Sequence, residues 1–435
     1  MELQVGLLLI IVFFTLLIFN VPISFSIVLS ALGAMVYCLT PKFGMFVSAQ
    51  KLATGMDSFT LIAVPFFILA GLLMGNGGIA KKLINLALAC FGKVPGSLAH
   101  TNIAGNALFG SLSGSGVAAA AAIGGVMGPL EKESGYDEGF SAAVNVATAP
   151  VGQLIPPTAA FIVYSLASGG TSVAALFMAG WIPGLLWCFV CMLVAFFIAK
   201  KHNYKTSDYK FDLKMICKCF IDAIPSLLLI VIVIGGIILG VFTPTEAAGI
   251  AVAYTFILSV FIYKSIKLSE MPKILSEAAV MTTTVMLIIG ASAVLSFVMS
   301  FTGLPTAISK LVLGISTNKI VILLVLNLFL LVVGTFMDMA PALLIFTPIF
   351  LPIVKTLGMD PIQFGVMIVM NLAVGTITPP VGNVLFVGCS VAELQIEDVM
   401  KKIIPFYGAI FVALLCITFI PQLSMWLPGV LGMIK

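Results

Sequence analysis

Arginine is absent from this sequence, and charged residues of any kind are scarce. The chain has 435 residues, of which only 9% are charged and 61% are hydrophobic. A soluble domain carries roughly 25% charged residues. The composition therefore excludes an ordinary water-soluble enzyme or binding module and predicts an all-α, multi-pass membrane protein. Because every one of the 21 basic residues is lysine, no guanidinium group is available for bidentate capture of a carboxylate.

Metal-binding and redox patterns are also missing. The two histidines, His100 and His202, are far apart in sequence and show no zinc-ligand spacing. Cys188 and Cys191 lie inside the apolar run 185–199, whereas a redox pair needs a polar, accessible setting, so we interpret them as small apolar helix residues. No His-Glu-x-x-His helix occurs. The sequence therefore disfavours a membrane-embedded enzyme, and we expect no cofactor and no transition metal.

Long apolar runs occupy most of the chain. A helix that crosses a bilayer needs about 20 apolar residues. The first run is not followed by a small-residue cleavage site, so we predict a transmembrane helix there and not a cleaved signal peptide. Ten crossings are predicted, two of them interrupted by prolines, at 4–20, 22–40, 58–76, 138–168, 173–199, 223–241, 245–264, 277–300, 361–390 and 404–428.

Two further segments consist of two apolar halves joined at a polar turn. Residues 97–133 turn at a Ser-Gly-Ser-Gly sequence (113–116), and residues 319–356 turn around Asp338. An unpaired carboxylate in lipid is costly, so it faces a cavity, an ion or a partner. Non-helical backbone at membrane depth needs protein or water around it. Both segments are predicted to be re-entrant hairpins. Short amphipathic arms precede them, near 79–93 and 304–315.

Several features recur at a constant offset of 223 positions. The pairs are Gly135 and Gly358, Asp137 and Asp360, Gly152 and Gly375, Pro129 and Pro352, and the proline pairs Pro156-Pro157 and Pro379-Pro380. Repeats with interrupted segments in matching positions point to a secondary transporter and to its binding site. We therefore expect scaffold helices in 1–56, a first repeat in 57–200, a cytoplasmic loop and scaffold helices in 201–276, and a second repeat in 277–435.

The lysines predict the orientation of these repeats. Five crossings separate residue 57 from residue 277 if the first hairpin is re-entrant, and an odd number inverts the second repeat. If the loop 200–218 is cytoplasmic, fifteen of the 21 lysines fall on that side, as the positive-inside rule favours. Both termini are then periplasmic or extracellular. The first hairpin opens from the cytoplasm and the second from the outside.

Side-chain oxygens gather at the hairpin tips and at the breaks. A proline pair frees backbone carbonyls of the preceding turn, and such carbonyls with side-chain oxygens coordinate Na⁺ in transporters. Helix N-termini following the turns, near 117, 159 and 342, would hold an anion without arginine. The predicted Na⁺ ligands are Ser113, Ser115, Thr158, Asp338, Thr376 and Thr378. The predicted substrate-binding residues are Asn106, Ser115, Thr335 and Asn383.

Structural alternatives stay open for some of these residues. The Gly-Ser cluster 110–116 also fits a close-packing motif between membrane helices. Asp338 also fits a helix cap at the hairpin turn. Glu246 follows Thr243-Pro-Thr245 and fits a helix start, with a threonine cap and an acid in the first turn. For Glu246 we favour the structural role.

Several motifs together resemble one family. They are Phe242–Ala248, Gly110–Gly116, Ile155–Thr158, Gly334–Asp338 and Thr378–Gly382. The set, which covers essentially the whole chain, resembles the large membrane subunit of TRAP transporters (tripartite ATP-independent periplasmic transporters). The resemblance implies an elevator-type transporter of the ion-transporter-superfamily type in the bacterial inner membrane, driven by a Na⁺ gradient. It implies organic-acid substrates such as C4-dicarboxylates, sialic acid or sugar acids.

The resemblance also implies two partners, a small four-helix membrane subunit and a periplasmic substrate-binding protein. The alternative is a self-sufficient Na⁺/dicarboxylate symporter that needs no binding protein. In either case we expect Asp338 to lie at a cation site and to hold the outer hairpin closed when Na⁺ is bound. The spans expected to form a static scaffold and to carry the small-subunit interface are 22–40, 223–241 and 245–264.

Overall fold

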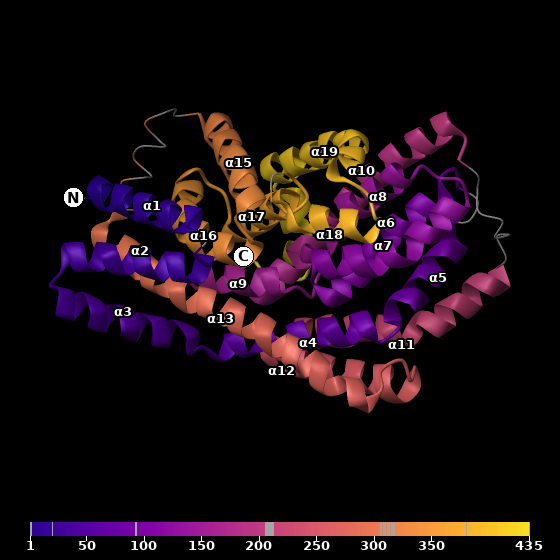
Figure 1. The fold of residues 1–435 in the computed structure, drawn as a ribbon, viewed down its shortest axis with the longest axis horizontal. Coiled ribbons are helices and arrows are strands. Elements are labelled where there is room, and N and C mark those ends of the chain that lie inside the picture. The colour runs from indigo at the N-terminus through magenta and orange to yellow at the C-terminus, as the bar shows by residue number, and fades with distance from the viewer. Residues whose placement is uncertain are drawn as a thin grey trace.

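All regular structure in the described part of the chain is helical, as the composition predicts (Figure 1). Most of the predicted arm at 304–315 lies outside the residues that the structure describes, and so does Pro380. The computed structural model describes residues 2–19, 21–91, 94–204, 213–304, 318–379 and 381–434, with positions 307, 310 and 314.

Three N-terminal helices and one long later helix lie side by side at one end of the molecule (Figure 1). They are α1 (Glu2–Ile18), α2 (Ile23–Cys38), α3 (Pro41–Met56) and α13 (Met271–Thr302). The apolar-run analysis left 41–56 unassigned, and the structure corrects this. Polar residues such as Lys42 and Gln50 dilute its hydropathy, although Pro41 in the first turn is a helix-start signal. The Lys51 ammonium lies 4.8 Å from the centroid of the Phe297 ring, which ties α3 to α13.

The first repeat begins with a bent pair of helices, α4 (Ala63–Asn76) and α5 (Ile79–Phe91), whose axes differ by 66°. The first hairpin follows as α6 (Ser97–Ser113) and α7 (Gly116–Glu133). The turn between them needs a left-handed backbone, and Gly114 supplies it with φ of 63°.

The second hairpin repeats this plan to within one residue. It consists of α15 (Lys319–Phe336) and α16 (Met339–Thr356). A shift of α7 by 223 positions gives 339–356, which are the bounds of α16. The turn here is Met337-Asp338, and both residues have extended backbone conformations. The predicted repeat of hairpins is therefore present in the helix boundaries themselves.

A broken helix follows each hairpin. The first comprises α8 (Glu138–Thr148), the 3₁₀ turn η2 (Ala149–Gln153) and α9 (Ala159–Ala167); the second comprises α17 (Pro361–Gly375) and α18 (Asn383–Val391). Asp137 and Asp360, one of the repeated pairs, accept the N-terminal N–H groups of Phe140 and Ile362 and so cap α8 and α17.

The remaining helices surround these units. They are α10 (Val173–His202), α11 (Leu213–Ile238), α12 (Pro244–Phe256), its π-helical extension η3 (Ile257–Ile262), the turn η4 (Leu268–Glu270), α19 (Ile396–Phe419) and α20 (Gln422–Val430). The crossing predicted at 404–428 is present as α19, but its bounds are wrong, because the chain breaks at Ile420. Pro421 follows it, and a residue before proline is driven out of the helical conformation. The helix-start role of Glu246 is confirmed by a reciprocal capping box with Thr243.

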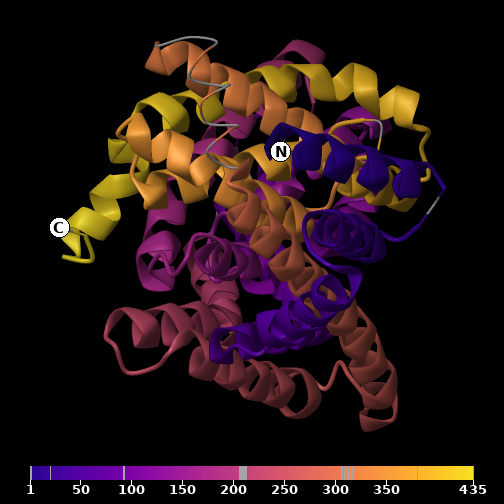
Figure 2. The same ribbon diagram turned by 90° about the vertical axis from the view of Figure 1, so that its left-hand side faces the viewer.

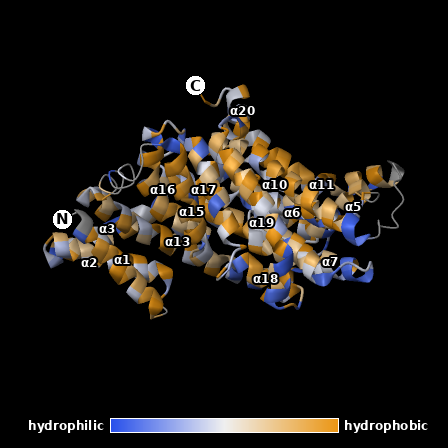
Figure 3. Ribbon diagram, turned by 90° about the horizontal axis from the view of Figure 1, so that it is seen from above, coloured by the Kyte–Doolittle hydropathy of each residue, from blue (hydrophilic) through white to orange (hydrophobic). Residues whose placement is uncertain are grey.

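The helices are apolar over most of their surface, and polar residues gather toward the ends of α5, α7 and α18 (Figure 3). Among the described residues seven helices are long and apolar enough to cross a membrane, or eight if the bent pair α4–α5 is one span. Two of the seven are the arms of the second hairpin, and α1, α2 and α17 are shorter apolar helices. The chain is a multi-pass membrane protein.

The two repeats exchange partners. Helix α7 of the first hairpin packs against α18, and α16 of the second hairpin packs against α9. Each hairpin therefore covers the second half of the other repeat's broken helix. Figure 2 shows α11 and α12, in rose, at the edge of the molecule opposite the second-repeat helices in orange and yellow.

Candidate functional site

Each hairpin is seated on a broken helix through a pair of glycines. A Cβ atom built on Gly152 would lie 2.2 Å from the Cα of Gly110, and one built on Gly375 would lie 2.2 Å from the carbonyl carbon of Gly334. Backbones approach this closely only where neither residue has a side chain. Gly110 and Gly334 are both in the last turn of a hairpin's first helix. The repeated contact places each hairpin tip beside the break of its own repeat.

The first tip meets the first break. A Cβ on Gly114 would lie 3.6 Å from the Cα of Thr158. The Ser115 hydroxyl accepts the Ala118 N–H at 3.2 Å, and the Thr158 hydroxyl accepts the Ala160 N–H at 3.2 Å. Both side chains are helix N-caps, for α7 and α9. The Ser113 hydroxyl faces the Ser115 N–H at 3.5 Å, so the three predicted first-repeat ligands lie together.

The second tip meets the second break through one short hydrogen bond. The Asn383 amide donates to the Asp338 carboxylate at 2.7 Å. Asp338 occupies the N-cap position of α16, yet its side chain makes no capping hydrogen bond there. Asp338 is exposed. The side-chain amide oxygen of Asn383 has no partner among the described residues. The side chain of Asp338 therefore links the hairpin to α18 and does not cap its own helix.

The first turn of α18 lies between the two tips. A Cβ on Gly116 would lie 3.2 Å from the Val384 side chain and 3.2 Å from the Cα of Pro150, and the neighbouring Asn383 binds the opposite tip. The N-terminal ends of α7, α9 and α18 thus come together. A helix N-terminus carries roughly half a positive charge and exposes unpaired N–H groups. Their convergence creates a positive region without arginine.

The predicted threonines of the second repeat share one hydrogen-bond pattern. The hydroxyls of Thr335, Thr376 and Thr378 donate to the carbonyls of Val332, Ala373 and Val374 at 2.7, 2.7 and 2.8 Å. A hydroxyl has one proton and two lone pairs. Each of these groups has spent its proton on its own helix and presents only lone pairs, as a cation ligand must. In the first repeat, by contrast, Ser115 and Thr158 use lone pairs to accept N–H groups.

The carbonyls near Pro379 are only partly free. The Thr376 carbonyl, which would have bonded the missing N–H of Pro380 in a continuous helix, accepts the Val384 N–H at 3.0 Å. A Cβ on Gly382 would lie 2.8 Å from the carbonyl oxygens of both Thr376 and Thr378, so these two oxygens point at the same loop position. The Thr376 oxygen also accepts the Leu385 N–H, at 3.4 Å. The Thr378 oxygen accepts the Gly382 N–H at 3.2 Å and keeps one lone pair, since a carbonyl oxygen has two.

Asn106 lies away from the tip, in a buried polar cluster. Seven residues separate it from Ser113, about 10 Å along a helix. Its amide nitrogen is 2.9, 3.0 and 3.0 Å from oxygens of Asn102, Asn145 and Thr148. We did not single out the rest of this cluster from the sequence, although Asn102 and Asn106 share one helix face at a spacing of four. Asn102 also donates to the buried carboxylate of Glu131, at 3.4 Å.

The second repeat has a smaller cluster at the corresponding place, between its hairpin and its broken helix. The Asn371 amide donates to the Asn327 carbonyl oxygen at 2.8 Å, and Thr418 donates to the same oxygen at 3.2 Å. All three residues are buried. Both clusters join a hairpin arm to the helix behind it, so they stabilise the assembly of each repeat.

Comparison with known proteins identifies relatives across the whole chain. A family profile described as "Tripartite ATP-independent periplasmic transporter, DctM component" matches residues 10–423. YgiK of Salmonella typhimurium is 51% identical over 409 residues, which cover 94% of each chain. The sialic acid TRAP transporter large permease protein SiaM of Vibrio cholerae is 36% identical over 413 residues, 95% of this chain and 96% of SiaM.

One solved structure shares the fold. The YdaH transporter of Alcanivorax borkumensis superposes with a TM-score of 0.61 and covers 89% of each chain, at 14% sequence identity. At that identity the likeness concerns the arrangement of the helices alone.

Proposed function

This chain belongs to the DctM family, the large membrane component of TRAP transporters, and on that premise we propose that it is the transport subunit of a Na⁺-driven uptake system for organic acids. It is a transport protein and not an enzyme. A periplasmic binding protein would deliver the substrate, and a small four-helix membrane subunit would complete the complex. We place it in the bacterial inner membrane with both termini on the periplasmic side, as the lysine distribution favours.

The convergence of the N-termini of α7, α9 and α18 is the observation that carries the proposal. These three ends offer N–H donors and positive dipoles to a carboxylate where no arginine exists. Ser115 and Asn383 stand at two of them. The substrate-binding roles predicted for Asn106 and Thr335 have less support. The amide of Asn106 is already hydrogen-bonded in its buried cluster. The name of SiaM supports an organic acid as the substrate class.

A Na⁺ ion resolves an electrostatic conflict at this place. Asp338 is negative and adjoins the first turn of α18 through Asn383, so it repels any anion bound there. A cation held by Asp338 and the lone pairs of Thr376 and Thr378 would neutralise it and let the anion bind. Ser113, Ser115 and Thr158 would form a second cation site at the other tip. Coupling then follows because the substrate binds well only when the ions are present.

We propose that the hairpins and breaks move together as an elevator against a static scaffold. The scaffold comprises the helices of 1–56 and of 201–276. Helix α12 packs on α4, α11 packs on α5, and α2 and α3 pack on α13, so the scaffold contacts the moving repeats chiefly through the helices that precede the two hairpins. The exposed apolar face of α11, at Leu228 and Val231 among others, is the surface we assign to the small subunit.

The ion proposal is tested on the purified chain without knowledge of the substrate. Thermal unfolding is measured while NaCl replaces KCl at constant ionic strength. Na⁺ should raise the midpoint, because a ligand that binds only the native state stabilises it. Asp338→Asn should leave the midpoint in KCl unchanged and raise the Na⁺ concentration for half-maximal stabilisation about tenfold or more.

Asp360→Asn is the matched control for this variant. Asp360 is also an N-cap acid of the second repeat, but it lies at the far end of α17, and asparagine caps as well as aspartate. It should behave as the parent protein does. If Asp338→Asn keeps the parent's Na⁺ dependence, the cation site lies elsewhere, and Thr376→Val and Thr378→Val become the next variants.

Uptake into proteoliposomes tests the substrate and the partners. The complete complex is supplied with labelled C4-dicarboxylates, sialic acid or sugar acids, with and without the binding protein. We expect one organic acid to accumulate, and only with both the binding protein and an inward Na⁺ gradient. Equal uptake without the binding protein would instead establish a self-sufficient symporter.

A further inference from the structure

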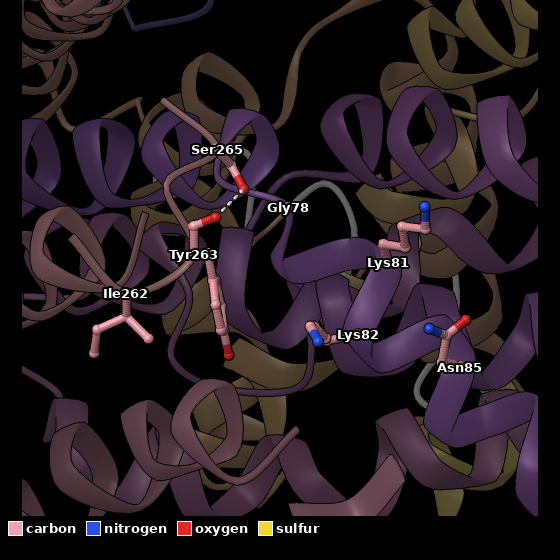
Figure 4. Close-up of a pocket in the computed structure, with 7 residues that line it drawn as sticks. All are labelled: Gly78, Lys81, Lys82, Asn85, Ile262, Tyr263 and Ser265. Atoms are coloured by element: carbon pink, nitrogen blue, oxygen red, sulfur yellow. Dashed lines mark hydrogen bonds between the residues drawn. The ribbon is translucent and has the colours of Figure 1, made fainter. Parts of the chain in front are cut away.

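A cationic surface pocket lies outside the hairpin tips, at the bend between α4 and α5 (Figure 4). The bend forms one wall of the pocket, and the chain after η3 forms the other. In Figure 4 the Lys82 amine lies on the Tyr263 side of α5, while the Lys81 amine, from the same turn of the helix, points away from Tyr263. The polar lining residues are Lys81, Lys82, Asn85, Tyr263 and Ser265, with Gly78 at the bend.

The two walls are held in register by tight contacts. Gly78 has φ of 73°, and a Cβ there would lie 2.6 Å from the Ser265 hydroxyl, so only glycine lets the walls close. The Ser259 hydroxyl, within the π-helical segment η3, donates to the Leu73 carbonyl at 3.2 Å. A π-helical stretch is rare and is often found at functional sites. The pocket is therefore a fixed feature of the fold.

The charge of the pocket is positive, since two lysines and no acid line it. One acid lies nearby: Asp222 of α11, whose carboxylate is 4.0 Å from the Lys82 ammonium. The two side chains are 39% and 48% exposed, and an exposed pair at that distance is worth little. Lys82 also lies 5.9 Å from the centroid of the Tyr263 ring, at the outer limit of a cation–π contact. Lys82 is thus available to an anionic ligand.

The surface beside the pocket is apolar. Phe261 and Ile262 in η3 are 59% and 57% exposed, and Phe220 and Ile221 immediately precede Asp222 in α11. Large exposed apolar side chains on a membrane protein face acyl chains or a partner. Cationic groups directly beside such a surface, on the lysine-rich side of the membrane, form the pattern that binds anionic lipid headgroups.

We propose that this pocket binds the phosphate of an anionic phospholipid. Lys82 and Lys81 supply the charge, and the Asn85 amide and the Ser265 hydroxyl supply hydrogen-bond donors. The acyl chains lie along Phe261 and Ile262. Because the pocket joins the arm α5 to the scaffold segment that follows α12, the bound lipid would bridge the two.

A second lysine pair provides a matched control. Lys401 and Lys402 of α19 also line a surface pocket, but Asp137, Glu138 and Asp398 line it with them. Its three acids outnumber its two lysines, so it should not hold an anion. The double variants Lys81→Gln/Lys82→Gln and Lys401→Gln/Lys402→Gln change the net charge of the protein equally.

The experiment uses the full chain, with any membrane partner that copurifies, and counts bound lipids by native mass spectrometry. Phosphatidylglycerol, phosphatidylcholine and inorganic phosphate are titrated separately. We expect phosphatidylglycerol to bind the parent protein. Its affinity should fall about tenfold or more in the Lys81/Lys82 variant and stay unchanged in the Lys401/Lys402 variant. Asp222→Asn removes the competing carboxylate and should strengthen binding. Thermal unfolding without added lipid verifies that each variant is folded.

Three results would overturn the proposal. The first is retention of phosphatidylglycerol by the Lys81/Lys82 variant. The second is an equal loss in the Lys401/Lys402 variant, which would mean that total charge alone governs binding. The third is equal binding of phosphatidylcholine or of inorganic phosphate, which would show that no anionic lipid is selected.

Discussion

The first hairpin carries its buried acid far from its tip, at Glu131 near the end of α7, whereas the second carries its acid at the tip, at Asp338. Glu131 is 1% exposed and belongs to the buried cluster around Asn106. Asp338 is exposed and held by a single hydrogen bond. The first helices of the two hairpins also differ in burial. Helix α6 is buried along nearly its whole length, whereas Leu328 and Val332 of α15 are 65% and 52% exposed.

This difference teaches that backbone plan and side-chain chemistry are separable in the two repeats. The glycine contacts recur in both, and the helices of the two hairpins begin and end within one residue of each other at the 223-position offset. Given that shared frame, the first hairpin is anchored on several sides through polar groups. The second is anchored at its base and exposes its charge, so we expect it to be the half that responds to ions.

Substitution of the seating glycines should have the largest effect, and an equal one in both repeats. Gly152→Ala and Gly375→Ala each force a Cβ to 2.2 Å from a backbone atom. Overpacking of this kind costs about 3 kcal/mol or more when backbone must move. The thermal midpoint in detergent should fall sharply for both. Gly128→Ala, where a Cβ would meet nothing within 4 Å, is the control.

An unequal result would break the comparison at its foundation. If Gly375→Ala were tolerated and Gly152→Ala were not, the second hairpin would be able to shift on its broken helix without loss of stability. The tight seating of hairpin on broken helix would then be required only in the first repeat.

Substitution within the polar clusters should separate the repeats. Asn106→Leu removes an amide whose two protons serve the oxygens of Asn102, Asn145 and Thr148, and it leaves buried acceptors unpaired. We expect a loss of about 2 kcal/mol. Asn327→Leu removes one acceptor shared by Asn371 and Thr418 and should cost less. Denaturant or thermal unfolding measures both, and the reverse order would show that the second repeat is the more firmly anchored.

The two hairpin acids should respond to different measurements. Glu131→Gln replaces a buried carboxyl group whose hydrogen bond to Asn102 is long, so stability should stay the same or rise by about 1 kcal/mol. Its Na⁺ dependence of unfolding should match that of the parent protein, in contrast to Asp338→Asn. A change in Na⁺ dependence on Glu131→Gln would give the first hairpin an ionic role as well.

The smallest effect is expected at the surface pair that joins the repeats. Lys402 of α19 lies 3.3 Å from Asp137, and both side chains are about two-fifths exposed. Lys402→Gln should cost about 0.5 kcal/mol at low salt, and 1 M KCl should remove the difference. A larger, salt-resistant loss would show that this contact, and not the buried packing, holds the repeats together.

Local features of the fold were accessible from the sequence, and contacts between distant segments were not. Glycine, serine and proline interrupt apolar runs at the hairpin turns and breaks, so these boundaries follow from short-range rules. Hydropathy averages over a window, which explains why α3 was missed and why the break at Pro421 was absorbed into one span. The exchange of α7 and α16 between the repeats has no local signal. The Na⁺ and substrate roles assigned to the tips stay predictions.

The link between Asp338 and Asn383 also lay beyond the sequence. Both residues were expected near the site, Asp338 as a cation ligand and Asn383 as a substrate ligand. Their hydrogen bond depends on a tip and a helix start that are 45 positions apart. No periodicity connects them, and only the folded arrangement shows that they act as one unit.

The exchange of packing partners has a consequence for how the protein is made. While the ribosome is still producing the second repeat, α7 and α9 are already in the membrane without the helices that cover them. At about 5–20 residues per second, the roughly 220 residues that separate matching elements need about 10–45 s to be synthesised. During that interval the nascent first repeat exposes uncovered surfaces that suit a holding chaperone or the insertion machinery. Neither repeat is a self-contained unit of biogenesis, so a gene split between them should yield a stable protein only when both fragments are made in the same cell.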